Sequence, residues 1–198
     1  MPAHRPTTHI LYLHGFRSSP QSTKARLMAA TVARECPSVT WWCPQLPPSP
    51  REAAELIKRG MAAWPRESMA VVGSSLGGFY ATWVAENMAC KAVLLNPAVF
   101  AARDLAQYVG EHTSWHDATE KFIFKPEYVD ELRALERRGL ACPENYFAII
   151  AKGDEVLSWQ EMTTRYTGAN IKLLEGSDHA ISEFADYLPG ILAFLSLP

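Results

Sequence analysis

The sequence predicts an α/β fold built on a parallel sheet of about six strands with helices on both faces. Short apolar runs alternate with helix-compatible segments along the chain. Strands that are separated by helices join through right-handed crossovers, which makes neighbouring strands parallel. The central strand candidates are apolar without interruption, as expected for strands buried on both faces. They are AVV within 69–73, AVLL within 91–96 and AII within 145–151.

Each element in the first half of the chain has a local signal. HILYL at 9–13 is rich in β-formers and ends at a glycine-containing turn, which predicts a buried strand. Residues 22–35 have helical composition and stop before Pro37, and SVTWWC at 38–43 predicts the second strand. Ser49 as N-cap, followed by Pro50 and Glu52, then predicts a helix that runs to about Trp64.

The remaining elements follow the same alternation. Strands are expected at 69–73, 91–96, 145–151 and 170–176, and helices at 76–88, about 158–166 and 184–196. The last of these helices is expected to bend or restart near Pro189.

A long connection, 97–144, interrupts the alternation. It is expected to hold a helix near 101–109, an irregular stretch at 111–125 and a charged helix at 126–138. A connection of about 48 residues at the ligand-binding end of a sheet is either a lid or a decorated crossover, and both readings stay open here.

Composition excludes several classes of protein. With 198 residues, 48% of them hydrophobic, the chain is long enough for one domain spanning 1–198. A net charge of −2 without a basic cluster argues against a nucleic-acid partner, and the apolar runs are too short for a membrane span or a signal peptide. The cysteines are scattered, which favours reduced thiols and a cytoplasmic location. The four cysteines are Cys36, Cys43, Cys90 and Cys142. The oligomeric state is not predicted.

The stretch VVGSSLGG indicates a nucleophile. Gly-x-Ser-x-Gly is satisfied only with Ser75 at its centre, between Gly73 and Gly77. In such an elbow a strand turns sharply into a helix, and side chains two residues before and after the nucleophile would clash. An apolar strand precedes this motif and a helix-compatible run follows it. Ser75 is therefore the predicted nucleophile, and Ser74 is structural.

A serine hydroxyl needs a histidine to remove its proton, and the histidine needs an acid to orient it. His179 follows the sixth strand and Asp154 follows the fifth, so both are expected at the same carboxyl edge as Ser75. Glu155 could replace Asp154 as the acid, and Asp178 is a weaker candidate. The order Ser, Asp, His is that of α/β-hydrolases.

Two backbone N–H groups are expected to form an oxyanion hole. Leu76 supplies one at the helix start, and Phe16 supplies the second from the loop after the first strand. His14, in the same loop, is expected to serve loop geometry. His112 and His116 have metal-ligand spacing, but without a third ligand neither a metal nor a cofactor is predicted.

Several segments together resemble the YqiA-like esterases: YLHGFRSSP, PQLPPSP, VGSSLGGFYATW, NPAV, KGDEVL and GSDHA. The resemblance spans about residues 10–188. It implies a compact α/β-hydrolase fold that lacks the first two strands of the full fold, carboxylic-ester hydrolase activity, and a triad at Ser75, Asp154 and His179. The departures concentrate in 100–145, where substrate selectivity is expected to reside.

The predicted substrate is a small-molecule acyl ester, with an acyl thioester as a variant. An apolar, proline-stiffened rim is expected from 41–48 together with Phe100, Trp115, Phe122 and Phe124, although each aromatic could equally fill the core. Arg17 could contact an anionic leaving group or be a solvated surface charge. The alternatives are peptidase or carbon–carbon hydrolase chemistry on the same fold, or a catalytically silent binding module.

Overall fold

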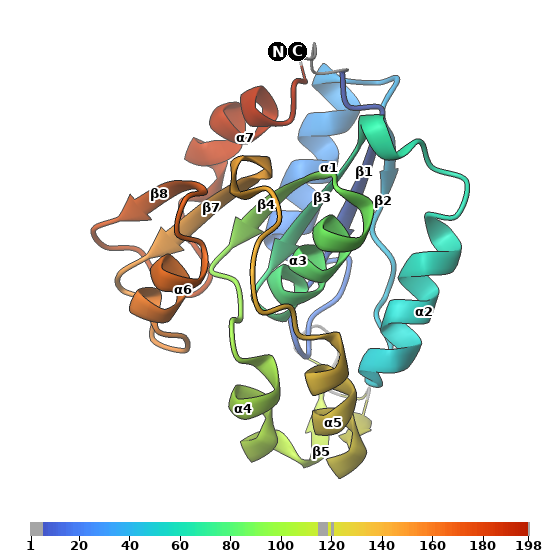
Figure 1. The fold of residues 1–198 in the computed structure, drawn as a ribbon, viewed down its shortest axis with the longest axis vertical. Helices are drawn as coiled ribbons and strands as arrows, with labels where there is room; N and C mark the ends of the chain where they lie inside the picture. The colour runs from blue at the N-terminus through green and yellow to red at the C-terminus, as the bar shows by residue number, and fades with distance from the viewer. Residues whose placement is uncertain (1–5, 115–118, 120, 198) are drawn as a thin grey trace.

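Six parallel strands form the central sheet of the computed structural model, which describes residues 6–114, 119 and 121–197. The strand order is β2-β1-β3-β4-β7-β8, and every neighbouring pair is parallel (Figure 1). This confirms the predicted sheet. Among the described residues, the sheet has no strand before β1. The strands are β1 (His9–Leu13), β2 (Thr40–Trp42), β3 (Met69–Ser74), β4 (Lys91–Leu95), β7 (Tyr146–Ala151) and β8 (Asn170–Leu174).

Helices cover both faces, and the twofold alternation of side chains decides which strand residues meet which helices. Ile10 and Tyr12 share one buried cluster with Met28 of α1 (Thr23–Glu35) and with α7 (Leu188–Phe194). Leu11 and Leu13 point the other way, into the cluster that holds Ile57. That second face is covered by α2 (Pro50–Gly60), α3 (Leu76–Met88) and α6 (Trp159–Arg165).

Element boundaries depart from the predicted ones at a few ends. The Ser49 hydroxyl accepts the Glu52 N–H at 3.2 Å, as a cap should, but α2 ends at Gly60 rather than Trp64. Glycine is a poor helix former, so this is a favourable place for the helix to end. The predicted restart of the last helix is confirmed: a 3-10 turn, Phe184–Tyr187, precedes α7, which carries Pro189 in its first turn.

The long connection is more regular than predicted. Its helices are α4 (Ala101–Leu105), followed by a 3-10 turn at Ala106–Tyr108, and α5 (Pro126–Leu135). The stretch expected to be irregular contains an antiparallel two-stranded sheet, β5 (Gly110–Thr113) and β6 (Lys121–Phe124). These elements lie beyond the carboxyl ends of the main strands, at the bottom of Figure 1.

Two residues considered in the sequence, Trp115 and His116, lie outside the described residues. In the part of the chain that is described, no helix is long and apolar enough to cross a membrane. All four cysteines are free thiols.

Candidate active site

The elbow after β3 holds Ser75 in a conformation that L-residues rarely adopt, with φ 56° and ψ −121°. Its N–H donates to the Leu95 carbonyl at 3.0 Å, which ties the turn to β4. A Cβ on Gly73 would lie 2.1 Å from the Gly77 carbonyl oxygen, and one on Gly77 would lie 1.9 Å from the Leu13 carbonyl oxygen. Both glycines are therefore required by close backbone approach, as the motif predicts.

Ser75, His179 and Asp154 form one hydrogen-bonded chain. The Ser75 Oγ lies 3.0 Å from His179 Nε2, and His179 Nδ1 lies 2.7 Å from Asp154 Oδ2. The Asp154 side chain is fully buried, whereas 21% of the His179 side chain is exposed. Because a carboxylate accepts hydrogen bonds, this contact places a proton on Nδ1 and leaves Nε2 facing the serine.

The two neighbouring acids differ in what they hold. Asp154 Oδ1 accepts the N–H groups of Val156 and Leu157, both at 2.8 Å, so its second oxygen is aimed at the imidazole. Glu155 accepts the backbone N–H of His179 at 3.0 Å instead, and therefore anchors the histidine loop. Asp154 is the acid in contact with the ring.

Asn96 is a site residue that sequence reasoning missed. It is fully buried, and its amide donates to the carbonyls of Asp178 and His179 at 3.0 and 3.2 Å. Its Oδ1 accepts the Ala151 N–H at 2.8 Å, at the end of β7 and just before the turn that holds Asp154. The Asn96 amide thus joins the end of β7 to the loop that holds His179. The available signal was an asparagine directly after an apolar strand, where a buried amide needs partners.

Asp178, the weaker candidate acid, binds Ser182 rather than the His179 ring. Its carboxylate accepts the N–H and the hydroxyl of Ser182, and this hydroxyl contact is the main reason that its pKa lies below the usual range. It therefore caps the turn after His179.

The loop after β1 passes close to Ser75. A Cβ on Gly15 would lie 3.3 Å from the Ser75 Cβ. His14 is buried; its Nε2 accepts the Leu46 N–H, and its Nδ1 donates to the Gly15 carbonyl, each at 3.0 Å. Both ring nitrogens are thereby used within this loop and the next one, which fits a positioning role. The oxyanion-donor roles of Phe16 and Leu76 remain predictions.

The β5–β6 sheet packs on this loop. The Phe16 ring lies edge-on to Phe122 and Phe124, with centroids 5.8 and 5.4 Å apart. Arg17, at φ 59°, donates through Nε to the Thr113 carbonyl at 2.9 Å. Arg17 therefore ties the loop to the long connection.

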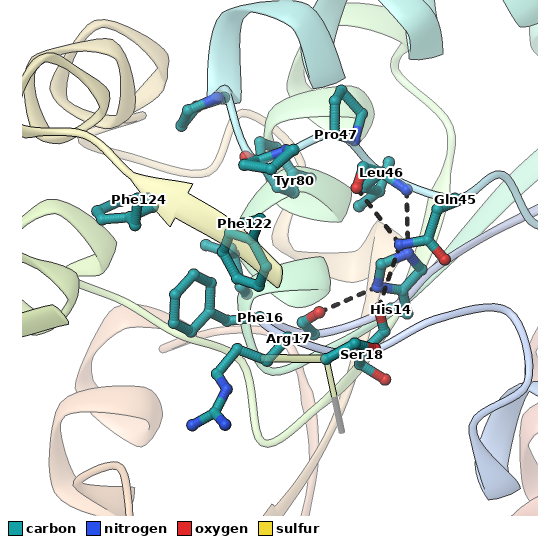
Figure 2. A pocket seen from close by; sticks show the side chains of 15 residues that line it. His14, Phe16, Arg17, Ser18, Gln45, Leu46, Pro47, Tyr80, Phe122 and Phe124 are labelled. Carbon is teal, nitrogen blue, oxygen red and sulfur yellow. Dashed lines mark hydrogen bonds between the residues drawn. The ribbon is translucent and has the colours of Figure 1, made fainter. Parts of the chain in front are cut away.

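Two cavities meet at this loop. The main cavity, about 880 Å³, is lined by Ser75 and His179 and also by Lys24, Leu105 and Tyr108. Burial lowers the pKa of Lys24 to about 8, against the opposing effect of Asp178 and Asp154. The second cavity, about 360 Å³, is shown in Figure 2 and shares Phe16 and Leu76 with the main one. Of the predicted rim, Gln45, Leu46, Pro47, Pro48, Phe122 and Phe124 line it.

Other predicted rim residues lie elsewhere. Trp41 and Trp42 pack against the two core clusters. The Arg103 guanidinium lies over the Phe100 ring, with its Cζ atom 4.6 Å from the centroid of that ring. The His112 ring lies edge-on to Phe16, with the ring centroids 5.5 Å apart. Within the described ranges, no group of three His, Cys, Asp or Glu side chains is placed to hold a metal ion.

Comparison with solved structures finds the same fold in α/β-hydrolases. Alpha/beta hydrolase domain-containing protein 10 from mouse superposes with a TM-score of 0.73 at 13% identity, covering 96% of this chain and 91% of that one. The metagenome-derived lipolytic enzymes LipS and LipT give 0.67 at 18% identity, with 98% of each chain covered. Est1E from Butyrivibrio proteoclasticus gives 0.66 at 13% identity, with 96% and 89% covered. At these identities the likeness shows the fold.

A family model identifies the chain more specifically. The model of the uncharacterised protein family UPF0227, the YqiA-like family, matches residues 9–196, nearly the whole sequence. With its α/β-hydrolase fold, the chain belongs to family UPF0227.

Proposed function

We propose that this protein is a serine hydrolase that cleaves carboxylic esters of small molecules through an acyl-enzyme. The observation that carries the proposal is the hydrogen-bonded chain from Ser75 through His179 to the buried Asp154, built on a strained elbow. A merely structural serine would not need this arrangement, because the strained conformation costs about 1–3 kcal/mol.

The contacts at Ser75 support the following first half of the reaction. His179 Nε2 takes the Ser75 proton as Oγ attacks the ester carbonyl carbon, and the carbonyl electrons move onto its oxygen. The Phe16 and Leu76 N–H groups would stabilise this oxyanion, Leu76 from the first turn of α3, where N–H groups lack intrahelical acceptors. The intermediate collapses, the bond to the alcohol oxygen breaks, and His179 returns the proton to the departing alcohol.

The second half regenerates the enzyme. A water molecule gives a proton to His179 and attacks the acyl carbon, and the second tetrahedral intermediate expels Ser75 Oγ, which recovers its proton from His179. The products are one carboxylic acid and one alcohol. Thioester cleavage would follow the same steps, with a thiol as leaving group.

The experiment compares the adjacent serines. Ser75→Ala should remove hydrolysis of p-nitrophenyl butyrate and labelling by a fluorophosphonate probe, while the matched Ser74→Ala variant should retain most of both. Equal losses in the two variants would mean that the nucleophile is wrongly assigned. If the probe labels Ser75 but no ester competes with that labelling, the result would point to peptidase or carbon–carbon hydrolase chemistry. A wild-type protein that neither hydrolyses esters nor takes the probe would be a binding module.

A further inference from the structure

The second cavity lies on one particular side of the reaction centre. It shares Phe16 and Leu76 with the main cavity, but Ser75, Asp154 and His179 are absent from its lining. Leu46 and Pro47 line it from the loop before α2, and Tyr80 lines it from α3 (Figure 2). Its volume of about 360 Å³ falls within the range of small-molecule sites. The cavity is therefore an extension next to the predicted oxyanion donors and away from the histidine.

This position bears on which half of an ester it would accept. In the tetrahedral intermediate the reacting carbon carries Ser75 Oγ, the oxyanion, the leaving oxygen and the acyl substituent. The leaving oxygen must lie beside His179, which gives it a proton, and the oxyanion must lie at the Phe16 and Leu76 N–H groups. The acyl substituent takes the remaining direction, away from His179.

We infer that the second cavity is the subsite for the acyl group of the ester, and that it takes a ring-bearing acyl group with an oxygen near its far end. This inference rests on the proposed function and adds to it the class of acid that is released. Two features of the cavity lining support this class of acyl group.

The first feature is the aromatic and proline-rich wall. Phe16, Phe122 and Phe124 form edge-to-face pairs on one side, and Pro47 and Pro48 stiffen the other. Aromatic rings prefer edge-to-face or offset partners, and prolines keep the opposite wall from collapsing. Such a wall favours a flat ring, although Arg17 and Gln45 also line the cavity.

The second feature is the Tyr80 hydroxyl. Tyr80 is 2% exposed and lines the cavity, and among the described residues none makes a hydrogen bond with its hydroxyl. This hydroxyl is not among the fully buried atoms without a partner, so a ligand oxygen that bonds to it gains the modest net affinity of one hydrogen bond exchanged with water. Burial, and secondly the nearby Glu131 carboxylate, raise the pKa of Tyr80, so the hydroxyl stays protonated and can donate to an oxygen.

The first test fills the cavity from one wall. Phe122→Trp should lower the ratio of kcat/KM for p-nitrophenyl phenylpropanoate to that for p-nitrophenyl acetate by about tenfold or more, as overpacking does. The matched control is Ile123→Trp, the next residue of β6, which is 58% exposed and outside the lining. It should leave the ratio unchanged. Taking a ratio cancels any general effect on the oxyanion loop.

The second test removes one oxygen. Wild-type protein should prefer the para-hydroxyphenyl analogue of the phenylpropanoate over the parent ester by about 2- to 12-fold, the worth of one hydrogen bond. Tyr80→Phe should abolish that preference and keep the preference for the ring over acetate. A ring preference that disappears as well would show that the variant has disturbed the cavity itself, and would contradict the role given to the hydroxyl.

The outcomes separate the two proposals. Ester hydrolysis that depends on Ser75, combined with ratios that Phe122→Trp does not change, overturns the acyl subsite and leaves the proposed function standing. If Phe122→Trp instead discriminates among acetate esters of large and small alcohols, the cavity takes the alcohol and the inference is wrong. A wild-type protein that cleaves no ester overturns both.

Discussion

At the scale of single residues, the contact between Asp154 and His179 should control the rate. Asp154 Oδ2 lies 2.7 Å from His179 Nδ1 and fixes the tautomer in which Nε2 accepts the serine proton. An amide at this position could donate to Nδ1 and would then stabilise the wrong tautomer. Asp154→Asn is therefore expected to lower kcat for p-nitrophenyl butyrate by about 10⁴, with a small change in KM.

Glu155→Gln is the matched control. Its side chain holds the His179 backbone N–H, an interaction that the glutamine oxygen can keep. A loss of about tenfold or less is expected, measured as kcat under the same conditions. A larger loss from Glu155→Gln than from Asp154→Asn would make Glu155 the acid.

The residues that sequence could identify were those in a motif or next to a predicted strand end. Ser75, Asp154 and His179 each directly follow a strand or the turn after it, so the topology alone brings them to one edge. Asn96 stands in the same kind of place, but its role depends on three backbone groups, two in the His179 loop and one at the end of β7. Nothing in the local sequence names those partners, and only the folded chain shows them.

At the scale of elements, the packing of α3 against β1 depends on Gly77. A Cβ there would lie 1.9 Å from the Leu13 carbonyl oxygen, so the helix would have to move off the sheet. Gly77→Ala should cost about 1–3 kcal/mol of unfolding free energy or more, and should misplace Ser75. Denaturant unfolding and probe labelling measure the two effects.

Gly190 in α7 gives the opposite case. A Cβ there meets nothing within 4 Å, and alanine is a better helix former than glycine. Gly190→Ala should raise the unfolding free energy by about 0.5–1 kcal/mol and leave labelling intact. A loss at Gly190 as large as that at Gly77 would show that the contact with the Leu13 carbonyl does not explain the effect at Gly77.

The elements that sequence predicted best were those with strong local periodicity or caps, such as β3 with α3 and the Ser49-capped α2. The β5–β6 sheet was missed because its strands are short and lie far from the main sheet. Its order comes from tertiary contacts, with Phe122 and Phe124 against Phe16 and with Thr113 bound by Arg17. Local propensity carries little information about such a pair.

At the scale of the whole molecule, the two layers of helices bury a set of phenols. Four tyrosines, each at most 2% exposed, are distributed between the two core clusters on opposite faces of the sheet. Burial is the main cause that raises the pKa of each one, and at Tyr146 a hydrogen bond to Glu86 adds to it. The four are Tyr12, Tyr80, Tyr146 and Tyr166.

These phenols should make the fold sensitive to alkali. Their pKa is raised in the folded state, so their contribution to stability is fully present below the unfolded value of about 10 and is lost as the pH rises above it. Each tyrosine that is protonated in the folded chain and ionised in the unfolded chain lowers the unfolding free energy by about 1.4 kcal/mol per pH unit. Lys24, with its pKa lowered to about 8, acts in the opposite direction between about pH 8 and pH 10. Burial also raises the pKa of the Cys43 and Cys90 thiols to about 12, so the loss should begin near pH 9 and become steeper above about pH 10.

Urea unfolding at a series of pH values, with phenolate absorbance followed in parallel, measures this dependence. Tyr12→Phe is the informative variant, because the Tyr12 hydroxyl has no hydrogen-bond partner among the described residues, so that the change removes a titrating group without breaking a bond. Its slope above about pH 10 should be smaller than that of the wild type by one tyrosine's share. Unfolding free energy that stays level to about pH 11, or phenolate absorbance that appears well before unfolding, would mean that the tyrosines ionise inside the folded chain. In that case solvent would reach the tyrosine hydroxyls through the two helix layers, contrary to the close packing of the core.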